Sequence, residues 1–198
     1  MSWLRIFILA LLVAPAAPGG PALAAPLLPS QAPTMEDVDA GIDHTGRDRD
    51  LPSEFRKQSV YYRTEQPPGT IIVNTADRHL YLIMGNGVAL RYGVGRDGFQ
   101  WGGIQTITLK REWPDWVPPP EMIARQPYLP RWMAGGPGNP LGARAMNLGA
   151  TVYRIHGTNA PETIGHAVSS GCFRLVNDDV ADLYSRVPLG TKVLVQHQ

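Results

Sequence analysis

Short apolar runs separated by turn residues make up most of the chain after residue 60. The segments TIIVN (70–74) and RHLYLIM (78–84) have the length and composition of β-strands. Alternation in the second strand predicts that Leu80, Leu82 and Met84 share one face. The sequence GNG that follows predicts an Asn-Gly hairpin turn. Further strands are predicted over 88–94, 104–110 and 191–196.

Helical patterns are confined to two short segments. PPEMIARQ (119–126) predicts one or two turns, because proline is tolerated at the first helical position. Near the end, Asn177 is predicted to cap a helix over 178–187, which Pro188 ends. No internal repeat is visible, so the pattern predicts a mainly β protein with one or two short helices.

The N-terminus has the pattern of an export signal. MSWLR supplies a basic head, IFILALLVA a short apolar run and Ala22–Ala24 a small-residue cleavage pattern. A membrane anchor is the alternative, but this run is too short to span a bilayer. We therefore predict a signal peptide over 1–24 and no membrane span after processing. The Pro- and Gly-containing stretch 25–58 is predicted to be a flexible linker, and 59–198 a folded domain.

Composition narrows the possible functions. The 198 residues are 43% apolar and 18% charged, which suits one packed domain with extensions. The formal net charge is only +1. This balance argues against a nucleic-acid partner and against an anionic membrane surface. We expect a monomer.

Two motifs resemble sites that the surrounding sequence does not support. GVGRDG (93–98) matches the glycine fingerprint of dinucleotide-binding proteins, but FQWGG follows where that fingerprint needs a helix. A mobile loop between strands is the better interpretation. His156, His166 and Cys172 do not have the spacing of a zinc site, and no fourth ligand is evident. We predict neither a metal nor a cofactor.

Cys172 is the only cysteine of the chain. In an oxidising compartment it could form an intermolecular disulfide, remain buried and inert, or serve as a reactive thiol. The preceding residues, SSG, are polar and flexible, which favours an accessible thiol over a buried one.

A cysteine nucleophile needs a neighbouring base, because a free thiol is mostly protonated at neutral pH. If the segments TVYRIH (151–156) and GCFRLV (171–176) form adjacent strands, Cys172 returns beside His156. Gly171 would let a substrate carbonyl approach, and backbone N–H groups of this turn could form an oxyanion hole. The residues alone predict a Cys–His acyl-transfer site with an unspecified acyl group.

Several motifs of the sequence occur in the order in which a known family of catalytic domains has them. HGT (156–158), IG (164–165) and SSGCFR (169–174) resemble the signature of the YkuD-type L,D-transpeptidase catalytic domain. PPGTIIVNTADRHLYLI (67–83) and NPLGARAMNLG (139–149) extend the resemblance to roughly residues 60–197. It implies a compact β-sandwich of mixed sheets with a helix near the catalytic cysteine.

The resemblance also implies a reaction. Members of the family act on peptidoglycan stem peptides. The cysteine attacks the carbonyl between the third residue and the terminal D-alanine of a tetrapeptide, D-alanine leaves, and an amine of a second stem resolves the thioester into a 3→3 cross-link. It further implies that carbapenems acylate the same cysteine.

The resemblance assigns roles to individual residues. Cys172 matches the nucleophile, His156 the general base, and Gly157 the position whose backbone orients the imidazole. Ser169, Ser170 and Gly171 would shape the cysteine loop and contact substrate. Arg174 would either brace this loop or bind a substrate carboxylate. Ser170 departs from the pattern, since many members carry histidine there; we expect effects on loop packing or substrate contacts.

The sequence is also compatible with other functions. Water in place of the amine would make the same site an L,D-carboxypeptidase or a cross-link-cleaving endopeptidase. A non-catalytic wall-binding protein is a third possibility, which the His156–Cys172 pair argues against. Trp101, Trp113 and Trp116 could form a glycan platform, but their size predicts anchors of the core and loops instead.

Overall fold

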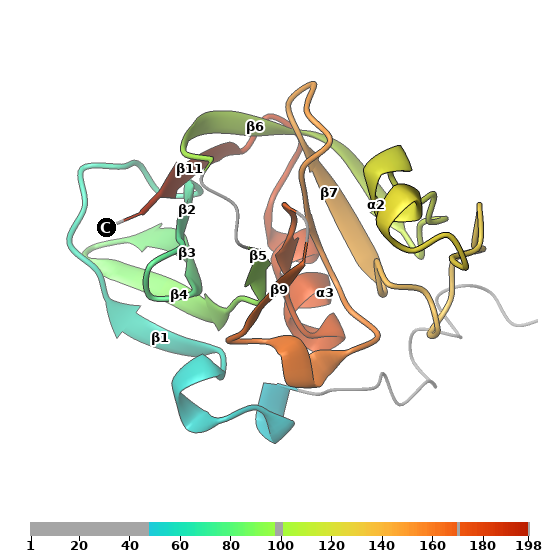
Figure 1. Ribbon diagram of the computed structural model, residues 1–198. Helices are drawn as coiled ribbons and strands as arrows, with labels where there is room; N and C mark the ends of the chain where they lie inside the picture. The colour runs from blue at the N-terminus through green and yellow to red at the C-terminus, as the bar shows by residue number, and fades with distance from the viewer. Residues whose placement is uncertain (1–47, 98–100, 170, 198) are drawn as a thin grey trace, which may run out of the picture. The chain divides into compact units, whose positions relative to one another are not determined.

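The structure is a computed structural model that describes residues 48–97, 101–169 and 171–197 (Figure 1). The predicted signal peptide, most of the predicted linker and Ser170 lie outside the described residues. Among the helices in the described ranges, none has both the length and the apolar character needed to cross a membrane.

Eleven strands are present in the described part of the chain: β1 (Gln58–Tyr61), β2 (Ile71–Asn74), β3 (His79–Gly85), β4 (Val88–Gly93), β5 (Arg96–Asp97), β6 (Gly103–Glu112), β7 (Arg144–Leu148), β8 (Arg154–His156), β9 (Ala167–Ser169), β10 (Phe173–Arg174) and β11 (Lys192–Gln196). The helical elements are 3₁₀ helices η2 (Asp48–Asp50), η3 (Ser53–Phe55) and η4 (Pro161–Thr163), and α-helices α2 (Pro120–Arg125) and α3 (Asn177–Arg186).

Nine of these strands form one mixed sheet in the order β1-β4-β3-β2-β11-β6-β7-β8-β10, and β5 pairs with β9. The long strand β6 joins the two halves of this sheet (Figure 1). Its first part pairs with β11 and its second part with β7. Since β2–β11 and β8–β10 are parallel and most other pairs antiparallel, the predicted mainly β fold of mixed sheets with short helices is confirmed.

The main hydrophobic core draws on both halves of the sheet and on α3. Ile71, Leu80 and Val193 come from the first half, and Ile107, Met146 and Ile155 from the second. Helix α3 adds Val180 and Leu183, both fully buried, to the same cluster. The short helix near the C-terminus is therefore held by burial of its apolar face.

The hairpin after β3 is confirmed in detail. Asn86 and Gly87 both have positive φ, 52° and 72°, as a two-residue turn between antiparallel strands favours. The predicted face of β3 is wrong at its end, because Met84 is 46% exposed while Leu80 and Leu82 are buried. The register shifts between Ile83 and Gly85, so Met84 no longer follows the alternation of the strand.

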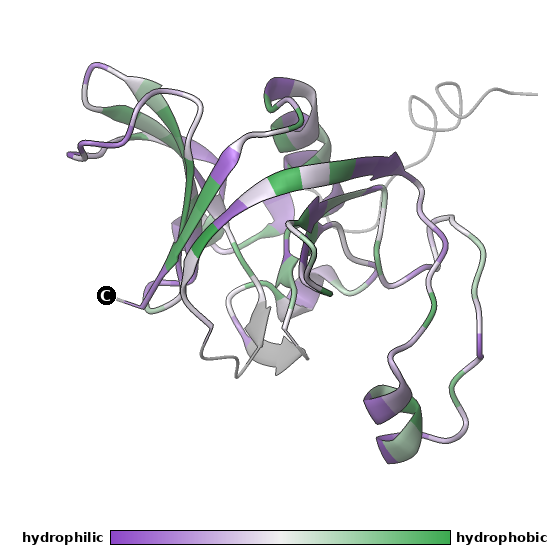
Figure 2. Ribbon diagram, turned by 90° about the horizontal axis from the view of Figure 1, so that it is seen from above, coloured by the Kyte–Doolittle hydropathy of each residue, from purple (hydrophilic) through white to green (hydrophobic). Residues whose placement is uncertain are grey.

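The predicted cap of α3 is also wrong. Asn177 is the first residue of the helix rather than its cap, and Val176 occupies the cap position without a side-chain hydrogen bond. The Asn177 side chain is buried, and its Oδ1 accepts hydrogen bonds from the backbone N–H groups of Ala143 and Thr158 instead. Helix α2 lies within the predicted segment 119–126, on an excursion between β6 and β7 that extends away from the sheets in Figure 2.

Residues 48–57 differ from the flexible linker predicted for this part of the chain. Leu51 and Phe55 are buried in a small cluster with Ile164 and Val176. A Cβ on Gly165 would lie only 2.4 Å from Cε2 of Phe55, so the ring packs directly on this glycine. The last part of the predicted linker is therefore folded onto the domain.

Trp101, Trp113 and Trp116 behave as the anchors that their size predicts. Trp113 and Trp116 are buried, and Trp101 packs on Tyr153 with ring centroids 5.4 Å apart. The backbone after β4 forms the short strand β5, and residues 98–100 that follow it lie outside the described residues.

Asp179 of α3 predicts an unusual pH dependence of stability. The residue is fully buried, and neither carboxyl oxygen has a hydrogen-bond partner among the described residues. Burial, and to a smaller extent the nearby Asp48, raise its pKa from 3.8 to about 8. The folded protein thus keeps a proton that the unfolded chain has released. We expect this group to lower the free energy of unfolding by up to about 1.4 kcal/mol per pH unit as pH rises from about 4 to about 8.

Asp179→Asn should remove this slope and stabilise the protein above about pH 8, with little gain below about pH 4. Denaturant unfolding of both proteins across this range measures the difference. Parallel stability profiles for the two proteins would contradict the prediction.

Candidate active site

Strands β8 and β10 bring the two halves of the predicted site together. They pair in parallel, with Phe173 opposite Ile155 and Arg174 opposite His156. The predicted adjacency of these segments is therefore confirmed. Phe173 and Ile155 point into the main core. Because successive side chains alternate along a strand, we expect Cys172, which directly precedes β10, to lie on the other side together with His156.

His156 is the last residue of β8, and its imidazole is buried. Its Nδ1 lies 2.6 Å from the carbonyl oxygen of Gly157. A carbonyl oxygen can only accept a hydrogen bond, so Nδ1 carries the proton and Nε2 keeps its lone pair. This tautomer leaves a base at Nε2.

The surroundings keep this imidazole neutral. Burial lowers the pKa of His156 to about 4, and the positive charges of Arg174 and Arg154 act in the same direction. The hydrogen bond to the Gly157 carbonyl, and to a smaller extent the backbone of Leu141, oppose the shift without reversing it. At neutral pH the ring is therefore uncharged and able to take up a proton.

Cys172 directly precedes β10 and is half-buried. Gly171 before it has φ of 126°, a backbone conformation that favours glycine. On the other side of the loop, Ser169 ends β9 and pairs with Asp97 of β5. Ser170 lies outside the described residues. The thiol thus follows a glycine turn and stands at the start of a strand held beside His156.

Arg174 is tied to the segment after β4. Its backbone exchanges hydrogen bonds with Gly95, at 2.9 and 3.0 Å. Its guanidinium covers Gly95 so closely that a Cβ there would lie 3.1 Å from Nη2. The side chain is buried. Of the two roles implied by the resemblance, bracing the loop and binding a substrate carboxylate, these contacts bear on the first.

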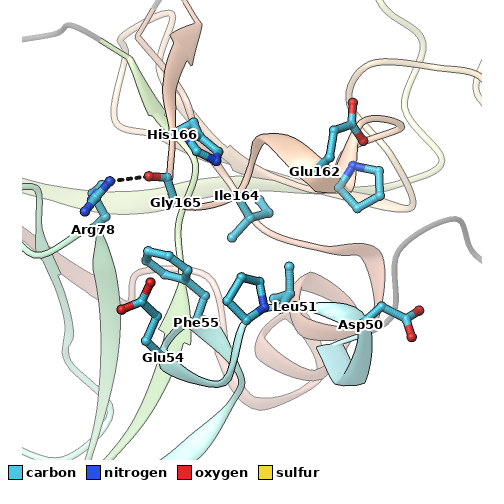
Figure 3. A pocket seen from close by; sticks show the side chains of 11 residues that line it. Asp50, Leu51, Glu54, Phe55, Arg78, Glu162, Ile164, Gly165 and His166 are labelled. Carbon is cyan, nitrogen blue, oxygen red and sulfur yellow. Dashed lines mark hydrogen bonds between the residues drawn. The ribbon is translucent and has the colours of Figure 1, made fainter.

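A cavity of about 500 Å³ lies on the side of Ile164 and Gly165 (Figure 3). In the described part of the chain its walls come from residues 50–52, 54–55, 78, 161–162 and 164–166, and include neither His156 nor Cys172. Figure 3 shows Arg78 donating a hydrogen bond to the Gly165 carbonyl, with the carboxylates of Asp50, Glu54 and Glu162 not converging on one point. The cavity therefore lies apart from the Cys–His chemistry.

His166 is exposed on the rim of this cavity, so it belongs to the cavity wall rather than to the His156 side of the fold. Within the described ranges, no group of three or more His, Cys, Asp or Glu side chains is arranged to hold a metal ion.

Two contributors to the site could not be predicted from the sequence. Leu141 supplies a backbone contact to the imidazole, and Asn177 holds the backbone on either side of it. A backbone contact leaves no signal in residue type. For Asn177, the local sequence predicted a helix cap and gave no reason to expect a contact with the site.

Comparison with known proteins gives a consistent result. The sequence model of the family YkuD, described as L,D-transpeptidase catalytic domain, matches residues 68–195. The probable L,D-transpeptidase ErfK/SrfK of Escherichia coli (strain K12) is 38% identical over 139 residues, which are 65% of this chain and 44% of that protein. The probable L,D-transpeptidase YcfS of the same organism is 38% identical over 143 residues, 65% of this chain and 44% of that protein. The chain thus spans less than half the length of these relatives.

A solved structure supports the fold. The L,D-transpeptidase from Mycobacterium smegmatis superposes with a TM-score of 0.51 at 19% sequence identity, covering 64% of this chain and 58% of that chain.

Proposed function

Because this chain belongs to the YkuD family of L,D-transpeptidase catalytic domains, we propose that it is a cysteine-dependent L,D-transpeptidase acting on peptidoglycan stem peptides. The donor is a tetrapeptide stem and the product a 3→3 cross-link. The observation that carries the proposal is the parallel pairing of β8, which ends at His156, with β10, which Cys172 directly precedes. It is supported by the contact of His156 Nδ1 with the Gly157 carbonyl, which leaves Nε2 as the base.

Acylation of the enzyme would be the first half of the reaction. Nε2 of His156 takes the thiol proton while Sγ of Cys172 forms a bond to the carbonyl carbon of the third stem residue. The tetrahedral oxyanion that results is stabilised by backbone N–H groups of Gly171 and Cys172. When the C–N bond breaks, Nε2–H returns the proton to the departing amine of D-alanine, and a thioester remains on Cys172.

Deacylation would repeat these steps with an incoming amine. The amine of a second stem attacks the thioester carbonyl, and Nε2 takes one of its protons. Collapse of the second tetrahedral intermediate breaks the C–S bond, and the proton returns to the thiolate. Serines 169 and 170 would contact the stem peptides, while Arg174 braces the cysteine loop from Gly95.

The proposed site of action is outside the cytoplasmic membrane. The support is the export pattern of residues 1–24, whose apolar run is short and is followed by small residues. The proposed substrate occurs in that same compartment.

Incubation of the protein with purified tetrapeptide muropeptides, followed by mass spectrometry, tests the function. We expect a dimer linked 3→3, with one D-alanine released for each link, because a positioned amine reacts with a thioester faster than water does. A trimmed tripeptide without dimer would instead assign an L,D-carboxypeptidase. An unchanged substrate would assign a non-catalytic protein, and either result contradicts the proposal.

A further inference from the structure

Asn177 stands at the start of α3, five residues after Cys172, and only 1% of its surface is exposed. Its Oδ1 accepts hydrogen bonds from the backbone N–H of Ala143, at 3.0 Å, and of Thr158, at 3.2 Å. Both neighbours are donors, so the oxygen rather than the nitrogen of the amide must face them. One side chain therefore joins the start of β7 to the residues that follow β8.

Two glycines make room for this oxygen. A Cβ on Gly142 or on Gly157 would lie 2.2 Å from Oδ1 of Asn177, far inside contact distance. The two glycine backbones also meet each other, since a Cβ on Gly157 would be 3.2 Å from Cα of Gly142. The space around position 157 therefore requires glycine there.

The contact to Thr158 acts on the catalytic histidine through one peptide group. The carbonyl of Gly157 and the N–H of Thr158 belong to the same planar unit and point in opposite directions. The N–H points to Asn177, and the carbonyl accepts the hydrogen bond from Nδ1 of His156. An anchor on the N–H therefore fixes the direction of the carbonyl.

We propose that Asn177 is a positioning residue that holds the Gly157–Thr158 peptide plane and thereby keeps the proton of His156 on Nδ1 and the base on Nε2. The inference rests on the proposed role of His156. Because Asn177 follows β10 closely, the same residue also ties the strand of the nucleophile to the strand of the base.

A purely structural role is the competing explanation, and the tautomer of His156 separates the two. In a ¹⁵N-labelled protein the protonated and unprotonated ring nitrogens give distinct NMR signals, which a His156→Gln variant assigns. We expect a single Nδ1–H tautomer in the unaltered protein and a mixture in Asn177→Ala. Turnover in Asn177→Ala should fall about 10- to 100-fold through kcat, with KM little changed.

Two further variants make the experiment selective. Asn177→Asp keeps an oxygen acceptor for both N–H groups and loses no bond of Nδ2, which has no hydrogen-bond partner among the described residues. It should restore the single tautomer and most of kcat. Thr191→Val is the matched control, because it removes the hydrogen bond from a buried side chain to the Pro188 carbonyl just beyond α3. It should lower stability without changing the tautomer.

The outcomes are separable from those of the proposed function. A single Nδ1–H tautomer in Asn177→Ala, with turnover per folded molecule unchanged, would overturn the positioning role. So would a loss in Asn177→Asp as large as in Asn177→Ala. The NMR result does not depend on the substrate, so it tests Asn177 even if the protein forms no cross-link.

Discussion

Cys172→Ala is expected to abolish both cross-link formation and covalent uptake of a carbapenem. Cys172 is the only cysteine of the chain, so no other thiol can replace it. The strained carbonyl of the β-lactam presents the same electrophile as the scissile amide, and the proposed nucleophile would attack it in the same way. The unaltered protein should gain the mass of one carbapenem, and the variant should gain none.

Intact-protein mass spectrometry measures this uptake, and peptide mapping should place the adduct on Cys172. Cys172→Ser should also fail, since an alcohol is a much weaker nucleophile than a thiol at neutral pH. Thr191→Val serves as the control for a change of comparable size away from the site, and should be acylated normally. An alanine variant that still forms 3→3 cross-links would refute the cysteine mechanism.

The pairing of the segments that carry His156 and Cys172 could be predicted from the sequence because it depends on local features. Two short β-forming segments flank a turn-rich loop, and such segments tend to pair. The structure pairs them as β8 and β10, although in parallel through the excursion that includes η4 and β9. Strand identity follows from residue pattern, so most of the sheet was predictable in the same way.

Asn177 shows where such prediction fails. An asparagine before an acidic turn is a normal helix cap. The local sequence holds no information on the two backbone N–H groups, one just before β7 and one just after β8, that compete for its side chain. Those donors come from residues 34 and 19 positions earlier in the chain. The tertiary contact uses the oxygen that a cap would have used, and the helix begins one residue earlier.

The prediction of a flexible linker did not hold for residues 48–57, for a similar reason. Their composition is that of a linker, but Phe55 packs against Gly93 and Gly165, at positions where any side chain would clash with it. A Cβ on Gly93 would lie 2.4 Å from the carbonyl oxygen of Phe55, and one on Gly165 would meet the ring at the same distance. A glycine in a sequence usually indicates a turn. Nothing in the sequence indicates that a glycine instead leaves space for an aromatic ring from a distant part of the chain.

The last expected result concerns the base. His156→Ala should slow acylation of Cys172 by about 10²- to 10⁴-fold while the protein stays folded, because a positioned general base usually accelerates a reaction by that factor. Nucleophile and base act together, so His156→Ala combined with Cys172→Ala should be hardly worse than Cys172→Ala alone. Rates of carbapenem uptake, with circular dichroism to confirm folding, measure both effects.

The pH profile provides the sharper test of His156. Its pKa of about 4 keeps the imidazole neutral through the weakly acidic range, so the acylation rate should fall only below about pH 4. As pH drops further, protonation of Nε2 removes the base, and the rate should decline about tenfold per pH unit. His156→Ala should lack this acidic limb, since no imidazole remains to titrate. A limb centred near the ordinary histidine value in the unaltered protein would show that the ring is not held neutral by its burial, and a limb that persists in His156→Ala would assign the base to another group.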